Sequence, residues 1–271
     1  MEINPKQAEA RSGDARFSVV TYNVLAQSYV KRDRYPGSPK QSLEAEYRHA
    51  LLLDRVAELD ADILCLQEVE PAVHEAIAAR LGAVYAAVYE AKRGRPDGAS
   101  VFIRRARFRV LESRALHYRA RSRGDDQLAL LVRCEDAATG RALTVACTHL
   151  RWQPREVSPE EHIGRRQLLE LLEGHQPEET WIVAGDLNAH SRSCVLRAAF
   201  ARGFELSCRS QRPWDTTNIN GRRRKLDYLL IPSGRLAPRP GVLPALERDT
   251  PMPSGSQPSD HLPLRVDFAW P

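Results

Sequence analysis

Acidic, amide and imidazole side chains stand at the ends of apolar, strand-like runs in this sequence. They occur in TYNVLAQ, LCLQEVE, CTHLRW, AGDLNAH, KLDYLL and SDHLPL, and they are Asn23, Glu68, His149, Asp186, Asn188, Asp227, Asp260 and His261. A rigid strand fixes such a group while the adjoining loop admits a substrate. The set therefore predicts one active site assembled from distant segments.

The chemistry that this set favours is hydrolysis of a phosphate ester. Such a reaction needs a hard cation, a positioned water, an acid near the leaving oxygen and donors for the developing negative charge. Oxygen donors without a thiolate cluster favour Mg²⁺, with Mn²⁺ as a substitute, over Zn²⁺. Taken singly, each residue has an ordinary explanation as a strand end, a turn cap or a surface pair. Only the ensemble favours catalysis.

The spacing of apolar residues predicts the elements that must position this site. Ten strand-like runs begin at residues 17, 62, 83, 99, 108, 127, 142, 181, 226 and 263. Helices are expected over residues 43–59, 71–81 and 160–173, and after Ser191 as a candidate N-cap. Many strands with few helices favour two packed sheets flanked by helices. With no linker or repeat, we expect one catalytic domain over residues 17–271 behind a polar tail over residues 1–16.

The bulk composition is that of a protein that folds around its own core. The chain has 271 residues, of which 42% are hydrophobic. Charges interrupt every long apolar stretch, which predicts no membrane span and a cytoplasmic location. Five scattered cysteines without a C-x-x-C pair predict reduced thiols. The net charge of +5 fits an anionic partner and fits a compositional bias equally well.

In their order, the motifs resemble those of the endonuclease/exonuclease/phosphatase superfamily. The resemblance runs through TYNVLAQ, ADILCLQEVE, PDGASVFI, THLRWQP, GDLNA, LDYLL and SDHLPL, from Phe17 nearly to the C terminus. NVLAQSY, EYRHALLLDRV and THLRWQP are similar to the branch of carbon-catabolite-repressor-type deadenylases, nocturnin and Angel-type proteins. The resemblance implies an α/β (α+β) fold, a four-layer α-β-β-α sandwich with two packed, mostly antiparallel sheets.

This resemblance implies a role for each carboxylate and amide at the site. Glu68 would ligate the principal Mg²⁺, with Asn23 and Asp260 nearby or bound through water. Asp186 would orient and deprotonate the attacking water. Asn188 would bind the reacting phosphate.

The histidines receive roles from the same resemblance. His261 would donate to the phosphoryl oxygens or the leaving group, and Asp227 would hold its imidazole in the useful tautomer. His149 would contact the phosphate from the opposite side. A carboxylate behind an imidazole that faces an anionic site also favours its protonation.

The expected substrate-binding residues are Trp152, Pro154, Asn218 and Asp97. Deadenylases of the branch carry a Phe-Thr-Asn-Tyr stretch whose ring helps to hold adenine, and Thr216 stands here in place of the phenylalanine. Base stacking is worth ~1–3 kcal/mol, so its loss should weaken a preference for poly(A). The Thr-Thr pair is closer to the Angel-type pattern, which is associated with removal of 2′,3′-cyclic phosphates from RNA.

The sequence thus predicts a Mg²⁺-dependent phosphoesterase that acts on RNA 3′ ends, either as a 3′-exonuclease or in 2′,3′-cyclic phosphate processing. We expect a monomer without a protein scaffold or a membrane partner. Two alternatives stay open. One is a phosphatase acting on a small nucleotide or sugar phosphate. The other is a catalytically inactive nucleic-acid-binding scaffold, although such proteins usually lose the metal carboxylate or the general base, and Glu68 and Asp186 are both present.

One stretch between residues 92 and 133 is unusually basic. Its closely spaced arginines are Arg104, Arg105, Arg107, Arg109, Arg119, Arg121 and Arg123. Alternate arginines of one strand could line a groove for a nucleic-acid backbone. The other interpretation, which we prefer, is a solvated strand face and loop.

Overall fold

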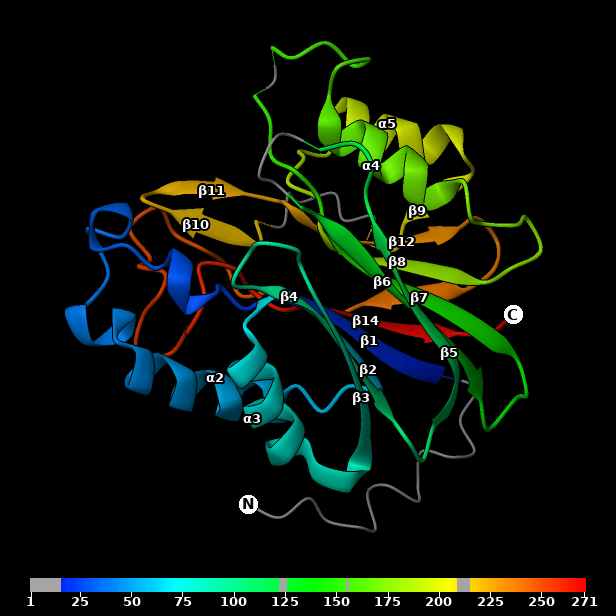
Figure 1. Cartoon of the computed structure of the whole chain (residues 1–271), viewed down its shortest axis with the longest axis horizontal. Helices are drawn as coiled ribbons and strands as arrows, with labels where there is room; N and C mark the ends of the chain where they lie inside the picture. Colours follow the sequence, from blue (N-terminus) through cyan, green and yellow to red (C-terminus); the bar gives the residue numbers. More distant parts are fainter. Residues whose placement is uncertain (1–15, 122–125, 155, 209–214) are drawn as a thin grey trace.

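A computed structural model describes residues 16–121, 126–154, 156–208 and 215–271 (Figure 1). The predicted polar tail lies outside these residues except for Arg16, which begins the first strand. One six-stranded sheet has the order β13-β14-β1-β2-β4-β3, and the other has the order β5-β6-β7-β8-β12-β9. The strands of the first sheet are β1 (Arg16–Asn23), β2 (Ile63–Val69), β3 (Tyr85–Ala91), β4 (Gly98–Arg104), β13 (Ala237–Pro240) and β14 (Leu264–Ala269).

The second sheet contains the other long strands. They are β5 (Phe108–His117), β6 (Leu128–Asp136), β7 (Ala142–His149), β8 (Trp181–Asp186), β9 (Phe204–Leu206) and β12 (Asp227–Pro232). Within each sheet one pair is parallel, β1 with β2 and β7 with β8, and the other pairs are antiparallel. A separate hairpin pairs β10 (Thr217–Ile219) with β11 (Arg222–Arg224). The expected sandwich of two mostly antiparallel sheets is confirmed.

Four α-helices among the described residues complete the layers. They are α2 (Ala45–Glu58), α3 (Pro71–Leu81), α4 (Ile163–Leu172) and α5 (Cys194–Ala201). Figure 1 shows α2 and α3 outside the first sheet and α4 and α5 outside the second. Short 3-10 turns are η1 (Gln27–Tyr29), η2 (Arg32–Arg34), η3 (Lys40–Leu43) and η4 (Gly82–Val84). The N-cap of α5 is Ser193, not Ser191, because the Ser193 hydroxyl accepts from the backbone N–H of Leu196.

Central strands are apolar throughout because both of their faces are covered. In β1, Val19 packs between the two sheets, whereas the next residue, Val20, packs under α2 and α3. In β8, Ile182 lies between the sheets and Val183 packs under α4 and α5. Successive side chains of a strand point to opposite faces. This alternation builds a central core and two outer cores from the same strands.

The ten predicted strands and four predicted helices are present, with small shifts at their ends. The strands that the apolar pattern missed are β9, β10, β11 and β13, each of three or four residues. Short strands of this kind depend on pairing with a distant segment, and β11 consists of three arginines. Local periodicity carries no signal for them.

Two expectations from composition can be compared with the structure. All five cysteines are free, and Cys194 alone among them is partly accessible. In the part of the chain that the structure describes, no helix combines the length and the apolar character needed to cross a membrane.

Candidate active site

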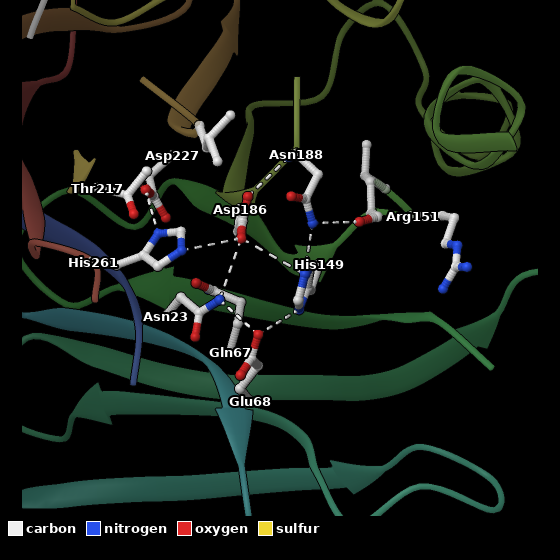
Figure 2. Close-up of polar contacts among 12 residues, drawn as sticks. Asn23, Gln67, Glu68, His149, Arg151, Asp186, Asn188, Thr217, Asp227 and His261 are labelled. Carbon is white, nitrogen blue, oxygen red and sulfur yellow. Dashed lines mark hydrogen bonds and ion pairs between the residues drawn. The ribbon is translucent and has the colours of Figure 1, made fainter. Parts of the chain in front are cut away.

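The predicted catalytic residues meet where the ends of strands from both sheets converge (Figure 2). The first sheet contributes Asn23 from β1 and Glu68 from β2. The second contributes strand-end residues from three neighbouring strands, namely His149, Asp186 and Asp227. The site therefore spans the seam between the two sheets.

Asn23 connects the two sheets directly. Its Nδ2 donates to Oε1 of Glu68 at 3.0 Å and to Oδ2 of Asp186 at 3.2 Å. Its Oδ1 accepts from the backbone N–H of Leu25 at 3.0 Å, which fixes the orientation of the amide. One buried amide thus holds two carboxylates on opposite sheets close together.

A β-bulge places the Glu68 carboxylate at this seam. The register between β2 and β4 shifts between Gln67 and Val69, and Glu68 has a φ of 56°. Such a conformation costs a non-glycine residue about 1–3 kcal/mol and tends to occur at functional sites. Glu68 Oε2 accepts from the backbone N–H of Ala26 at 3.2 Å. The extra residue turns the side chain out of the regular alternation and toward Asp186.

His261 and Asp227 form a buried pair on one side of Asp186. The Nδ1 atom of His261 lies 2.8 Å from Oδ2 of Asp227, and Nε2 lies 3.6 Å from Oδ2 of Asp186. Burial alone would lower the pKa of His261, but the two carboxylates raise it well above its ordinary value. The imidazole is therefore protonated and donates from Nδ1 to Asp227. Its Nε2–H faces the centre of the site.

His149 lies on the other side of Asp186 and behaves in the opposite way. Burial, and then the positive charge of Lys92, lower the pKa of His149 well below its ordinary value. Its Nε2 accepts from Nδ2 of Asn188 at 2.8 Å, which places the single proton on Nδ1. That Nδ1 is buried without a hydrogen-bond partner among the described residues, 3.7 Å from Oε1 of Glu68.

The carboxylates carry more negative charge than their neighbours neutralise. Burial raises the pKa of Asp186 to about 7, and Asp227 and Glu68 add to this rise, while His261 opposes it. Burial also raises the pKa of Glu68 above its ordinary value, with Asp260 as the next cause. Buried carboxylates that resist ionisation in this way are suited to bind a cation, which would hold them in the charged form.

Two sets of residues could hold a divalent ion. Asp186, Asp227 and His261 bring ligand atoms within 4.8 Å of one another. His261 and Asp227 are bonded to each other, however, and a protonated imidazole cannot ligate a metal. Glu68, with Asn23 and Asp260 near it, makes the better set of ligands, because hard cations prefer carboxylate and amide oxygens.

Asp260 lies close to this set and is held from two sides. Its Oδ2 accepts from the hydroxyl of Tyr35 at 3.0 Å, and its backbone oxygen accepts from Oγ1 of Thr217 at 2.6 Å. It is 5% exposed, and its charge raises the pKa of Glu68. The structure thus brings the carboxylate of Asp260 near that of Glu68.

A buried arginine fixes the two loops that follow and precede these residues. The Nη1 atom of Arg48, in α2, donates to the backbone oxygens of Val24 and Pro258, each at 3.0 Å. Its Nε donates to Oε1 of Gln27 at 2.8 Å. Val24 directly follows Asn23, and Pro258 lies two residues before Asp260, so one guanidinium joins the backbone on both sides of the site.

Sequence reasoning overlooked several residues that shape the site. Ser259 donates to the backbone oxygen of Asn23 at 2.7 Å and accepts from the N–H of His261 at 3.1 Å. Lys92 is buried, and its charge acts on both Glu68 and His149. A lysine three residues after the predicted strand that begins at residue 83, and five residues before Asp97, was the signal that could have been used.

The four predicted substrate-binding residues fall into two groups. Trp152 and Pro154 are exposed and, with Asn188, line a cavity of about 520 Å³ beside the catalytic cluster. Asn218 is not at this cavity, because its buried Nδ2 donates to the backbone oxygens of residues 247, 248 and 250. Asp97 is also fully buried, since its carboxylate binds Lys92 and the hydroxyl of Tyr29, each at 2.6 Å. For Asn218 and Asp97 the structure therefore shows structural contacts in place of the expected contact with substrate.

The basic stretch does not form an arginine groove in the described residues. Arg104 and Arg107 are buried in ion pairs with Asp60, Asp62 and Asp136. Among the exposed members, Arg109, Arg119 and Arg121 each pair with an acidic neighbour, and Arg105 donates to the backbone oxygen of Tyr85. Arg123 lies outside the described residues. Pairing with nearby carboxylates agrees with the solvated strand face and loop, not with a phosphate-binding surface.

Comparison with known proteins agrees with the family resemblance of the sequence motifs. The sequence model described as "Endonuclease/Exonuclease/phosphatase family" matches residues 20–261. Nocturnin of Xenopus laevis is 28% identical over 97% of this chain and 75% of its own length. Ccr4, the CCR4-Not complex 3′-5′-exoribonuclease subunit of Saccharomyces cerevisiae, is 26% identical over 66% of this chain and 26% of its own length.

Solved structures with the same fold include those of human nocturnin and ANGEL2. The human nocturnin catalytic domain with bound sulfate has a TM-score of 0.73 and 25% identity, covering 94% of both chains. ANGEL2, a 2′,3′-cyclic phosphatase, in complex with adenosine-2′,3′-vanadate has a TM-score of 0.77 and 23% identity. That alignment covers 94% of this chain and 96% of the ANGEL2 chain.

Proposed function

Since the chain belongs to the endonuclease/exonuclease/phosphatase family and is a hydrolase of phosphate esters, we propose that it acts on the 3′ ends of RNA with Mg²⁺ as its ion. Mn²⁺ is the expected substitute. The observation that carries the proposal is the buried cluster of Asn23, Glu68 and Asp186, drawn from both sheets and flanked by one protonated and one neutral histidine.

In this proposal the ion is held by Glu68, with Asn23 and Asp260 beside it. When bound, the ion supplies electrostatic stabilisation for the negative charge that develops on the reacting phosphate. The side-chain oxygens fit this ion, since they are carboxylates and an amide with no thiolate among them. Burial raises the pKa values of Glu68 and Asp186. A nearby cation favours the ionised forms of both carboxylates, so ion binding would offset this effect of burial.

Asp186 is the proposed base that orients and deprotonates the attacking water. Its Oδ1 accepts from the backbone N–H of Asn188 at 2.8 Å, so its carboxylate has a fixed direction. A carboxyl group with a pKa of about 7 is matched to proton abstraction near neutral pH. The lone pairs that remain face the space between His149 and His261.

His261 is the proposed donor to the phosphoryl oxygens or to the leaving group. Its Nε2–H points into the site while Asp227 holds Nδ1. His149 and Asn188 are proposed to contact the phosphate from the opposite side. Both N–H groups of the Asn188 amide are engaged, by His149 and by the backbone oxygen of Leu150. Phosphate binding by Asn188 therefore requires that it exchange one of these partners.

An RNA 3′ end is the proposed substrate class for two reasons. The related Ccr4 is named as a 3′-5′-exoribonuclease, and the structurally similar ANGEL2 is named as a 2′,3′-cyclic phosphatase. Thr216 is buried, and its hydroxyl accepts from the N–H groups of Leu226 and Asp227, so it braces the start of β12 and offers no ring to a base. The absence of a ring at this position supports a weak preference for adenine. Cyclic-phosphate removal and exonuclease action both remain candidate activities.

The test compares the protein with its Asp186→Ala variant on labelled RNA. Oligoadenylate, mixed-sequence RNA and RNA with a 2′,3′-cyclic phosphate are each incubated with Mg²⁺ or with EDTA. A ladder of shortened products identifies an exonuclease, and a change in the terminal phosphate alone identifies end processing. The variant should lose turnover by at least about 100-fold while its circular dichroism spectrum is unchanged. Near-normal activity of the folded variant would refute the proposal.

A phosphatase acting on a small nucleotide or sugar phosphate is the second candidate. The chain is similar to nocturnin over 97% of its length, and this similarity is the reason for keeping a small phosphate ester as a candidate substrate. Equal catalytic efficiency on a mononucleotide and on an RNA oligomer with the same 3′ end would favour this candidate over RNA.

A further inference from the structure

The exposed cationic strand β11 ends at the cavity that Asn188 also lines. All three of its residues, Arg222, Arg223 and Arg224, are exposed. Arg223 donates to the backbone oxygen of Leu246 at 2.6 Å and lies 3.9 Å from Asp215. Because side chains alternate along a strand, Arg222 and Arg224 share the opposite side. Neither has an ion pair or a side-chain hydrogen bond within the described part of the chain.

Arg224 also belongs to the wall of the cavity beside the site. Two further arginines, Arg192 and Arg197, line this cavity, and Nη1 of Arg197 donates to the backbone oxygen of Arg192 at 2.8 Å. Among the described lining residues, Glu156 alone is acidic. Trp152, half exposed at 50%, supplies an aromatic face in the same wall. The lining thus combines unneutralised guanidinium groups with a stacking surface.

This cationic wall is continuous with the catalytic residues. Asn188 lines the cavity and binds His149. The backbone oxygen of Arg224 accepts from the N–H of Thr216 at 2.8 Å, and the next residue, Thr217, pairs with His261 in an isolated β-bridge. These backbone contacts join β11 to the segment that carries His261.

The earlier basic stretch offers a contrast within the same chain. Most of its described arginines are paired with acids or buried, and the exposed Arg105 donates to the backbone oxygen of Tyr85, whereas Arg222 and Arg224 remain free to bind an anion from outside. Two residues apart on a strand, these arginines are about 6.7 Å apart, so together they can contact two neighbouring phosphates of one chain. A polyanion fits this arrangement better than a single nucleotide does.

From these observations, and resting on the proposed function, we infer that β11 and the adjoining cavity bind the phosphodiester backbone of single-stranded RNA on the 5′ side of the reacting end. Arg222 and Arg224 contact successive phosphates. Arg192 and Arg197 hold the nucleotide next to the site, and Trp152 stacks on its base. Arginine forms bidentate contacts with phosphate, and stacking on an aromatic ring tolerates any base.

The experiment compares RNA chains of ten and two nucleotides that share one 3′ end. An Arg222→Ser/Arg224→Ser double variant should raise KM for the decamer about tenfold and leave the dinucleotide unaffected. The control is Arg105→Ser/Arg109→Ser, which removes two exposed arginines from the region between β4 and β6. It should change neither substrate. Equal effects of the two double variants on the decamer would overturn the inference.

Salt dependence and binding keep this test separate from the proposed function. Each lost contact to a single strand lowers the slope of log affinity against log salt by about 0.7, so the double variant should lose about 1.4. Anisotropy of a labelled decamer in EDTA measures this without turnover. If no RNA is hydrolysed but the wild-type protein binds and the double variant does not, the inference survives the failure of the proposed function. A slope unchanged by the variant, or equal affinity for a blunt duplex, would overturn it.

Discussion

Two buried histidines that flank one carboxylate differ in charge, since His261 is protonated and His149 is neutral. Both His149 and His261 lie 3.6 Å from Oδ2 of Asp186. What separates them is the second partner, since Asp227 accepts from His261 whereas the amide of Asn188 donates to His149. A carboxylate behind an imidazole stabilises its charge, and an N–H donor prevents protonation of the nitrogen it binds. The second partner, together with the positive charge of Lys92 near His149, thus sets the charge of each imidazole.

We predict that Asp227→Asn lowers kcat by about 10²- to 10⁴-fold, the usual contribution of general acid catalysis. Asp227 raises the pKa of His261, so without its charge the pKa falls. Because the donor must be protonated, the alkaline limb of the pH–rate profile should move to lower pH. Asp126→Asn is the matched control, since its Oδ2 lies 2.9 Å from Nδ1 of His117 in a similar pair outside the cluster. A profile that does not move would exclude His261 as the donor.

At the level of secondary structure, the order of motifs predicted the fold because each long strand is buried on both faces. A run such as WIVAGD must be apolar on both sides to fit between the outer helices and the inner core. The same logic placed Glu68, Asp186 and His261 at strand ends. The four short strands escaped prediction, since hydrogen bonds to distant partners hold them and no apolar period marks them.

We predict that Arg48 acts on catalysis as well as on stability. Arg48→Met leaves the backbone oxygens of Val24 and Pro258 without their donor, at about 1–3 kcal/mol each. Their release should let the segments that carry Asn23 and Asp260 shift, so kcat should fall in protein that is still folded. Urea denaturation measures the stability, and kcat is measured at a temperature where the variant is folded.

The matched control for this prediction is Arg107→Met. Arg107 is also buried, but it pairs with Asp136, the last residue of β6, at 2.8 Å. Its loss leaves a buried carboxylate unpaired and should cost about 3–5 kcal/mol. The control should lose stability with little change in kcat. If both variants keep their kcat, Arg48 has a structural role alone.

At the scale of the whole molecule, the site exists only when the two sheets are packed. Asn23 and Asp186 are 163 residues apart in the chain, yet 3.2 Å separates their side-chain atoms. Motif order could predict which residues take part. It could not predict that Asn218 and Asp97 are buried, because their burial depends on contacts with residues 247–250 and with Lys92.

We predict that Mg²⁺ stabilises the folded protein. An ion that binds only the native state adds RT ln(1 + [L]/Kd), about 2.7 kcal/mol at one hundred times Kd. The melting temperature should therefore rise with Mg²⁺ relative to EDTA. Glu68→Gln should abolish this rise, because it removes the charge of the principal ligand. An equal rise in the variant would place the ion elsewhere in the molecule.

The β-bridge between Thr217 and His261 has a consequence for how this protein can diverge. The hairpin that is exposed to solvent and the imidazole that is buried share one hydrogen-bonded segment. A mutation that reshapes the hairpin to accept a new polymer should also move the imidazole of His261. A change in substrate recognition through the hairpin should therefore also change kcat. The loop that carries Trp152 and Pro154 in the same cavity is tied in a similar way, because it follows Leu150, whose backbone oxygen accepts from Nδ2 of Asn188.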